Sequence, residues 1–254
     1  MHPIQVQAGP LPLQNLYLTC ESGERRGSFS SQQVQCEKLQ RKEQVTAATP
    51  DNYPHDLVRD VVCDGSFSYH LRPIRPDDAA ELMAFHSRLT PHSVYLRFFT
   101  FHPTLSGPEA ERFTHVDYIN RLALVAESEA HIIAVGRFDS GPGETEAEVA
   151  FVVADEYQHH GIGPLLLDEL ARAAVARGIT TFRAETLCEN HAMLDVFHHA
   201  GFSVTSTIEF GSVTLRFSIE PTERYRVALA ERETRRHLTP AMHPAAPNDA
   251  MTQA

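Results

Sequence analysis

The 254-residue sequence has little of several features that would assign it to a class directly. It has four scattered cysteines, Cys20, Cys36, Cys63 and Cys188, and no C-x-x-C pair. Neither a zinc module nor a disulfide framework is therefore indicated, and a reducing compartment is expected. Basic residues are outnumbered 22 to 33 by acidic ones, for a formal charge of −11. Because nucleic-acid binding depends on clustered Lys and Arg, no nucleic-acid partner is expected.

Long apolar runs and targeting signals are also lacking. No segment approaches the roughly 18 apolar residues of a membrane helix. The N-terminal stretch MHPIQVQAGPLPLQNL lacks the charged and apolar regions of a signal peptide. The sequence thus predicts a cytoplasmic protein with no membrane partner. Its 15 histidines show no metal-ligand spacing such as H-E-x-x-H, so no metal is expected.

A hydrophobic content of 42% is enough for a substantial core, and the patterning places that core in the middle of the chain. Residues 1–60 are rich in Gln, Ser and charge, which predicts a mostly disordered tail with some helix over residues 32–44. Residues 221–254 are predicted as a second tail, with a short helix over residues 223–237 before a Pro/Ala-rich end. The compact domain is expected over residues 61–220.

Within that domain the periodicity predicts an alternation of strands and helices. Thr90 and Asn190 are the expected N-caps of two of the helices. Strands are predicted over residues 68–74, 122–127, 132–138, 146–154, 181–186, 203–209 and 213–219, and helices over residues 76–89, 91–98, 108–116, 162–177 and 191–200. The sum is an α+β domain with a mixed central sheet of about seven strands, helices on both faces and one βαβα crossover.

The stretch YQHHGIGPLLLDEL, which follows the apolar strand EVAFVVAD, carries the strongest functional signal. Free backbone N–H groups and the helix dipole make a helix N-terminus an anion site, and glycine lets a phosphate approach the backbone. Two nucleotide-binding motifs fail here. G-x-G-x-x-G would need glycine where Leu166 stands, and the P-loop would need Lys followed by Ser or Thr.

The motif that remains is Q-x-x-G-x-G, formed by Gln158, Gly161 and Gly163. Together with Asn190 and the later H-H-A-G-F, it resembles the pyrophosphate loop region of the GCN5-related N-acetyltransferase (GNAT) family. The resemblance extends over residues 69–219. The segments LRPIRPDDAAELMAFHSRLTPHSVYLRFF and FTHVDYINRLALVA look like the acetyltransferase domain of bacterial protein-lysine acetyltransferases, the Pat-like proteins. The resemblance implies a GNAT fold and acetyl-CoA as co-substrate.

It also implies roles for particular residues. Backbone groups of the strand would pair with the pantetheine arm, amides of the turn would bind the pyrophosphate, and Asn190 would contact the arm or a water near it. The implied cofactor residues are Phe151, Val152, Val153, Gln158, His159, His160, Gly161, Ile162, Gly163, Pro164 and Asn190. Two of them depart from the family pattern. His160 stands where Arg or Lys is frequent, and Pro164 removes an amide, so weaker binding of CoA is expected.

Aminolysis of a thioester requires a neutral amine, and a lysine with a pKa near 10.4 is almost fully protonated at pH 7. A carboxylate must therefore accept a proton. Glu146 and Glu148 share one face of the strand, and Glu148, in the sequence E-V-A-F, is predicted as the general base. Phe197 stands where many relatives place a tyrosine that protonates the thiolate, which leaves Tyr157, His159 or water for that role.

The resulting hypothesis is an acetyl-CoA-dependent N-acetyltransferase that transfers the acyl group directly to an amine, with a protein lysine as the implied acceptor. Asp117 is a candidate to attract a cationic acceptor amine. Two alternatives stay open. One is a small-molecule amine acetyltransferase, and the other is a non-catalytic acyl-CoA sensor, which His160, Pro164 and Phe197 favour.

Overall fold

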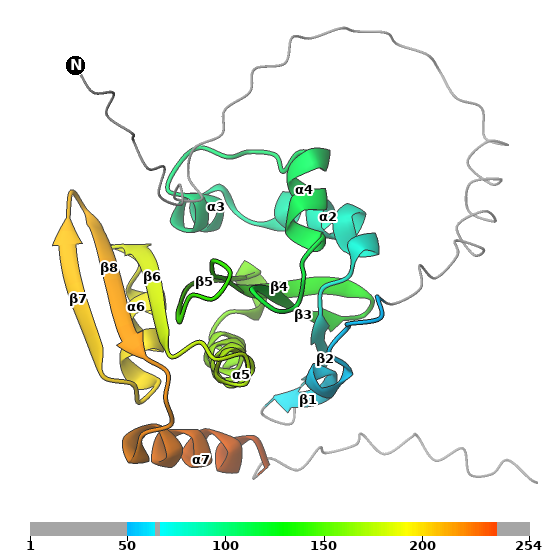
Figure 1. Ribbon diagram of the computed structural model, residues 1–254. Coiled ribbons are helices and arrows are strands. Elements are labelled where there is room, and N and C mark those ends of the chain that lie inside the picture. Colours follow the sequence, from blue (N-terminus) through cyan, green and yellow to red (C-terminus); the bar gives the residue numbers. More distant parts are fainter. Residues whose placement is uncertain (1–49, 64–66, 238–254) are drawn as a thin grey trace, which may run out of the picture. The chain divides into compact units, whose positions relative to one another are not determined.

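The structure, a computed structural model, describes residues 50–63 and 67–237 (Figure 1). The predictions for residues 1–49, including the helix over 32–44, and for residues 238–254 lie outside this range. The helices are α2 (Ala79–Arg88), α3 (Pro91–Phe98), α4 (Gly107–Thr114), α5 (Ile162–Val175), α6 (His191–His199) and α7 (Glu223–His237). None of the helices in these residues is both long enough and apolar enough to cross a membrane.

The strands form one mixed sheet. They are β1 (Arg59–Cys63), β2 (Phe67–Pro73), β3 (Arg121–Ser128), β4 (His131–Asp139), β5 (Glu146–Val153), β6 (Thr181–Leu187), β7 (Val204–Glu209) and β8 (Ser212–Ser218). Within the described residues their order is β1-β2-β3-β4-β5-β6-β8-β7, and only β5 and β6 run parallel there. The prediction of a mixed sheet is confirmed, but the expected count of about seven strands is wrong by one.

The strand that the sequence analysis missed is β1. Its five residues, RDVVC, are too short to show a period, and they become a strand through pairing with β2 from Arg59 opposite Leu71 to Cys63 opposite Phe67. Tertiary pairing of this kind is not visible in local propensity.

Helices cover both faces of the sheet, as predicted (Figure 1). One apolar cluster joins the sheet to α2, α3 and α4, with Phe85 and Ile74 among its fully buried members. A larger cluster on the other face joins it to α5 and α6, where Leu166, Leu170 and Phe197 are buried. The sheet is therefore buried on both sides through its centre.

The compact domain extends beyond both predicted boundaries. Tyr53 and Leu57, which the sequence analysis assigned to the N-terminal tail, are buried in the larger cluster. Helix α7, assigned to the C-terminal tail, packs on the same side of the sheet. Its Tyr225 stacks on Phe202 with ring centroids 4.4 Å apart. The boundaries at residues 61 and 220 leave out these core residues.

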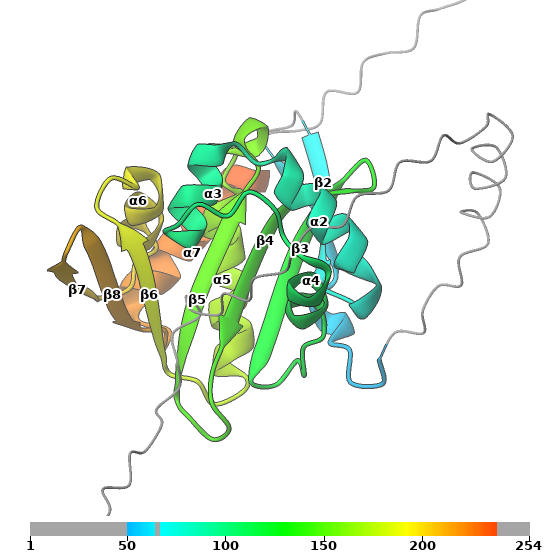
Figure 2. The same cartoon turned by 90° about the horizontal axis from the view of Figure 1, so that it is seen from above.

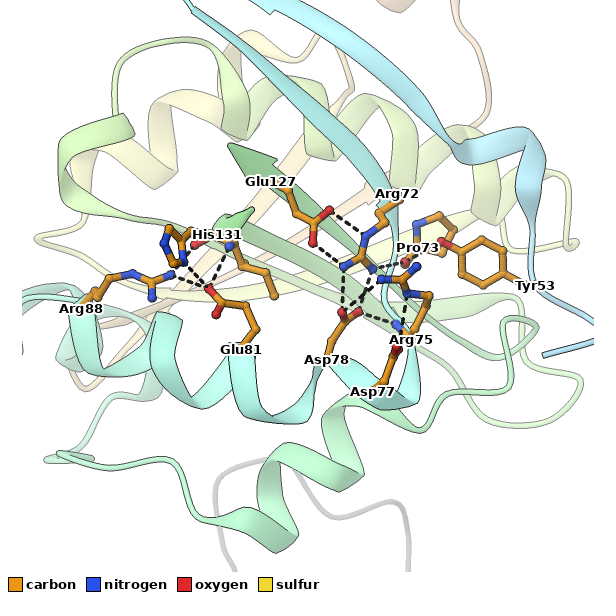
Figure 3. A network of polar contacts seen from close by, with 11 residues as sticks. Tyr53, Arg72, Pro73, Arg75, Asp77, Asp78, Glu81, Arg88, Glu127 and His131 are labelled. Carbon is orange, nitrogen blue, oxygen red and sulfur yellow. Dashed lines mark hydrogen bonds and ion pairs between the residues drawn. The ribbon is translucent and has the colours of Figure 1, made fainter. Parts of the chain in front are cut away.

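A buried polar network fixes the start of α2 (Figure 3). Arg72 on β2 donates to both carboxylate oxygens of Asp78 at 2.7 Å and also pairs with Glu127 on β3. Asp78 in turn accepts from the backbone N–H of Arg75. A buried guanidinium with two carboxylate partners ties α2 to the two strands beside it, because any one of these charges would be costly to leave unpaired.

Candidate active site

The sheet opens between its two parallel strands. Strands β5 and β6 pair only from Glu146 opposite Thr181 to Glu148 opposite Arg183, while pairing of β5 with β4 continues to Val153. Figure 2 shows β5 and β6 diverging toward their C-terminal ends. Beyond Glu148, the β6-facing edge of β5 thus has backbone groups without a strand partner, and such groups need hydrogen bonds. An extended ligand that carries amides can supply them, as in strand addition.

The glycine turn lies at the end of this opening. Gly161 is the N-cap of α5 with φ +77°, and His159 also has a positive φ of 65°. A Cβ at Gly161 would meet no described residue within 4 Å, so the backbone there faces open space. The 14 residues of α5, about four turns, follow. The first N–H groups of a helix have no intrahelical acceptor. The turn therefore offers donors to an anion.

Pro164 occupies the first turn of α5, where its missing N–H interrupts no helical hydrogen bond. Gly163, by contrast, is buried, and a Cβ there would touch Val196 at 3.6 Å and Phe151 at 3.7 Å. These are ordinary contacts, so Gly163 is less constrained than Gly161.

The structure brings all eleven predicted cofactor residues to one cavity of about 770 Å³. They are Phe151, Val152, Val153, Gln158, His159, His160, Gly161, Ile162, Gly163, Pro164 and Asn190. Residues from α3 and α6 complete the walls. A cavity of this size, between diverging strands and a helix N-terminus, suits an elongated anionic ligand.

Two of these side chains also hold the site together. The amide of Gln158 donates to the carbonyl of Val153 at 3.2 Å, which ties the turn to the end of β5. The carbonyl oxygen of Asn190 accepts from the N–H of Met193 at 3.1 Å and caps α6, as predicted. Its amide group stays available as a donor to a ligand.

Sequence reasoning missed how α3 is fixed over the cavity. Asp155, just after β5, accepts from the hydroxyl of Thr90 at 2.8 Å and from that of Ser93 at 2.7 Å. Thr90 also caps α3, as predicted. This clamp places Arg97 on the cavity wall. The N-cap was readable from the sequence, but its partner 65 residues away was not.

Arg232 of α7 is another wall residue that the sequence analysis did not identify. Its guanidinium pairs with Asp168 on α5 at 2.7 Å and donates to the carbonyls of His199 and Ala200 at 3.2 Å. The C-terminal helix thus closes one end of the cavity.

Glu148 is not among the residues that line the large cavity. It lies opposite Arg183 on β6 and opposite Asp139 on β4, at the point where the opening begins. Burial raises the pKa of the Glu148 carboxyl above its ordinary value, and the Arg97 and Arg183 guanidiniums offset part of this rise. Glu146, two residues earlier, is held by Arg216 at 2.6 Å.

Two other predicted features have structural roles. Phe197 is buried and packs between Phe151 and Phe217, each with ring centroids 5.5 Å away. The carboxylate of Asp117, proposed from the sequence to attract an amine, accepts the backbone N–H groups of Ile119, Asn120 and Arg121 at 2.8–2.9 Å. Its lone pairs are engaged in a turn, so the prediction for Asp117 is not supported.

Comparison with known proteins agrees with this geometry. Residues 92–202 match the model of the acetyltransferase (GNAT) family. The chain is 31% identical over 159 residues to acetyltransferase Pat of Mycolicibacterium smegmatis, covering 61% of this chain and 47% of that protein. It thus spans about half the length of that relative. An acetyltransferase of Pseudomonas aeruginosa is 26% identical over 136 residues, covering 52% of this chain and 73% of that protein.

Among solved structures, the GNAT domain of S. lividans PAT superposes with a TM-score of 0.62. The two are 37% identical, and the match covers 66% of this chain and 99% of that domain. A match of this identity over the whole of a GNAT domain, with the glycine turn and the open sheet at the expected place, shows that the chain belongs to the GNAT family of acetyltransferases.

Proposed function

We propose that this protein is an acetyl-CoA-dependent N-acetyltransferase that acylates a protein lysine. The observation that carries the proposal is the single cavity that joins the open edge of β5 to the N-terminus of α5. An acyl-CoA carries both an amide-rich arm and a pyrophosphate along one extended molecule. The proposed acceptor class rests on the likeness to the GNAT domain of S. lividans PAT.

In the bound complex, backbone groups of Val149–Val153 pair with the pantetheine amides, and the N–H groups of Gly161, Ile162 and Gly163 hold the pyrophosphate. The helix dipole favours the anion by about 0.3–1 kcal/mol in addition to these hydrogen bonds. His160 stands in this turn where the family pattern frequently has Arg or Lys. Its ring also contacts Phe67 edge-on with centroids 5.2 Å apart, which restrains it beside the turn.

Glu148 is the proposed general base. The neutral lysine nitrogen attacks the thioester carbon, the C–S bond of the resulting tetrahedral intermediate breaks, and CoA leaves as a thiolate. Glu148 accepts the proton of the attacking amine, directly or through water. A carboxyl with a raised pKa is a stronger base than an exposed glutamate, and the charges of Arg97 and Arg183 favour its ionised form.

The leaving group receives no proton from Phe197, because that side chain is an apolar part of the core. A thiolate departs without protonation more readily than an amine would. Tyr157 is the one tyrosine among the described residues that line the cavity, so we assign it the role of a secondary proton donor.

The test compares Glu148→Gln with Glu146→Gln, a matched change on the same face of the same strand. Binding of acetyl-CoA is measured by calorimetry, and turnover by release of CoA thiol with an acyl-CoA synthetase or spermidine as acceptor. We expect Glu148→Gln to bind normally and lose about 10²–10⁴-fold in kcat. Glu146→Gln should change kcat far less, because Arg216 already holds that carboxylate.

Equal losses in the two variants would contradict the assignment of the base. Turnover with spermidine as acceptor, but with none of the protein acceptors, would indicate that the acceptor is a small amine and not a protein lysine. Tight acetyl-CoA binding without turnover on any amine would indicate a sensor instead of an enzyme.

A further inference from the structure

A second, smaller cavity of about 50 Å³ lies on the face of the sheet that α2, α3 and α4 cover. It shares two lining residues, Arg97 and Val152, with the large cavity. Ala150, which also lines it, is two residues from Glu148 on the same face of β5. The small cavity therefore adjoins the proposed CoA site beside the proposed base.

The lining is mainly apolar, with side chains such as Phe85, Phe98 and Val135. Three residues in it carry nitrogen donors: His86, Arg97 and Arg137. An apolar enclosure that contains cationic or hydrogen-bonding groups at a few points selects ligands that have an apolar stem and a polar end.

The two guanidiniums differ in their partners. Arg137 pairs with Asp139 at 3.0 Å and lies over the ring of Phe113, 4.6 Å from its centroid. Arg97 lies over the ring of Phe98, 5.3 Å from its centroid, but forms no ion pair or hydrogen bond with any residue in 50–63 or 67–237. Glu148 and Asp139 lie close enough to influence its charge. Burial lowers the pKa of Arg97 to about 10, so it stays charged at neutral pH.

His86 is the group in this cavity whose buried nitrogens lack partners among the described residues. It is 4% exposed, and neither ring nitrogen has a hydrogen-bond partner within the part of the chain that the structure describes. Its ring contacts Phe98 and His102 with centroids 5.6 and 5.4 Å away. Burial, helped by His102, lowers its pKa, so the ring is neutral and offers one N–H. A buried polar ring without a hydrogen-bond partner lowers the stability of the folded protein unless a ligand supplies the partner.

We propose that this cavity is the subsite for a short acyl chain that ends in a carboxylate, of the malonyl and succinyl class, with Arg97 and His86 as its donors. The inference rests on the proposed function. The volume admits roughly three to five non-hydrogen atoms, judged from the space one water needs. A succinyl group places two methylenes and a carboxylate beyond its thioester carbonyl, whereas acetyl places only a methyl there.

The transfer step is the same for a succinyl group as for an acetyl group. The lysine nitrogen bonds to the thioester carbon, CoA leaves as a thiolate, and the proton of the amine passes to Glu148. The distal carboxylate takes no part and stays paired with Arg97. The product lysine carries a negative charge where it carried a positive one.

The experiment measures binding of acetyl-CoA, butyryl-CoA and succinyl-CoA to the full chain by calorimetry, without acceptor. Butyryl is the matched control, since it has the same chain length without the charge. We expect wild type to bind succinyl-CoA about tenfold or more tightly than butyryl-CoA, the usual gain from a hydrogen bond to a charged group. Arg97→Gln should abolish this ratio, and His86→Phe should reduce it several-fold while acetyl-CoA binding stays unchanged.

Both affinities are measured on the same variant, so any effect of Arg97 on Glu148 cancels in the ratio of succinyl-CoA to butyryl-CoA affinity. Thermal melting confirms that each variant is folded. Equal or weaker binding of succinyl-CoA relative to butyryl-CoA, or a ratio that survives in Arg97→Gln, would overturn the inference. Binding of acetyl-CoA alone would overturn it while leaving the proposed function intact. Absence of binding by all three would overturn both.

Discussion

The ion pair between Arg232 and Asp168 should be a main anchor of the C-terminal helix. Their side chains are 12% and 3% exposed, so Arg232→Met leaves a buried carboxylate without its cation. Removing one partner of such a pair costs about 3–5 kcal/mol. For a domain of this size, about 2–4 °C of melting temperature is lost per kcal/mol, which gives a decrease of roughly 6–20 °C.

The matched control lies on the same helix. Arg226 pairs with Glu223 at 3.5 Å, with side chains 64% and 81% exposed, so Arg226→Met should change stability by less than about 0.5 kcal/mol. Urea unfolding of both variants, with thermal melting in parallel, measures the difference. A double variant that also replaces Asp168 by Asn should recover part of the loss, because the buried charge is then removed while the side chain can still accept a hydrogen bond from Tyr225.

If Arg232→Met is no more destabilising than Arg226→Met, the buried ion pair does not anchor α7. That result would mean that α7 does not stay docked in solution, and that one end of the proposed CoA cavity is open. An intermediate result with no recovery in the double variant would instead assign the loss to the hydrogen bonds that Arg232 donates to His199 and Ala200.

Further predictions concern the base and the core. The pKa of Glu148 is raised, so Glu148 is protonated at a higher pH than an ordinary glutamate. When the pH is lowered, kcat should therefore begin to fall at a higher pH than it would with an ordinary glutamate as base. Arg97→Gln removes a charge that favours the ionised form, so the acid limb of the pH–rate profile should move further upward; an unmoved limb would contradict the coupling. Gly136→Ala should cost about 1–3 kcal/mol in urea unfolding, because its Cβ would lie 3.1 Å from Leu170 Cδ1. Gly107→Ala, whose Cβ meets nothing within 4 Å, should be nearly neutral, and equal effects would contradict the packing argument.

The parts of the site that are local in sequence were predictable. The turn around Gly161, the caps Thr90 and Asn190, and the alternation that separates Glu148 from Val149 each depend on spacing within a few residues. Periodicity and turn chemistry report such features directly.

The parts that depend on contacts between distant segments were not predictable. Strand β1 exists through its pairing with β2, and α7 is docked through Tyr225 and Arg232, contacts that no local pattern encodes. The same limit applies to the small cavity. His86 looks like any helical histidine in the sequence. Only packing against the sheet reveals that its ring is buried without a hydrogen-bond partner in the described part of the chain.

The most direct test of the central claim is calorimetric titration of the full chain with acetyl-CoA, repeated on Gly161→Asp. Gly143→Asp is the control, because Gly143 has nearly the same φ, +76° against +77°, and lines neither cavity described above. We expect wild type and Gly143→Asp to bind acetyl-CoA. Gly161→Asp should not bind it, because the new carboxylate occupies the pyrophosphate position and repels the anion. Equal binding by all three proteins would contradict the assignment of the glycine turn, and no binding by wild type would contradict the proposed function.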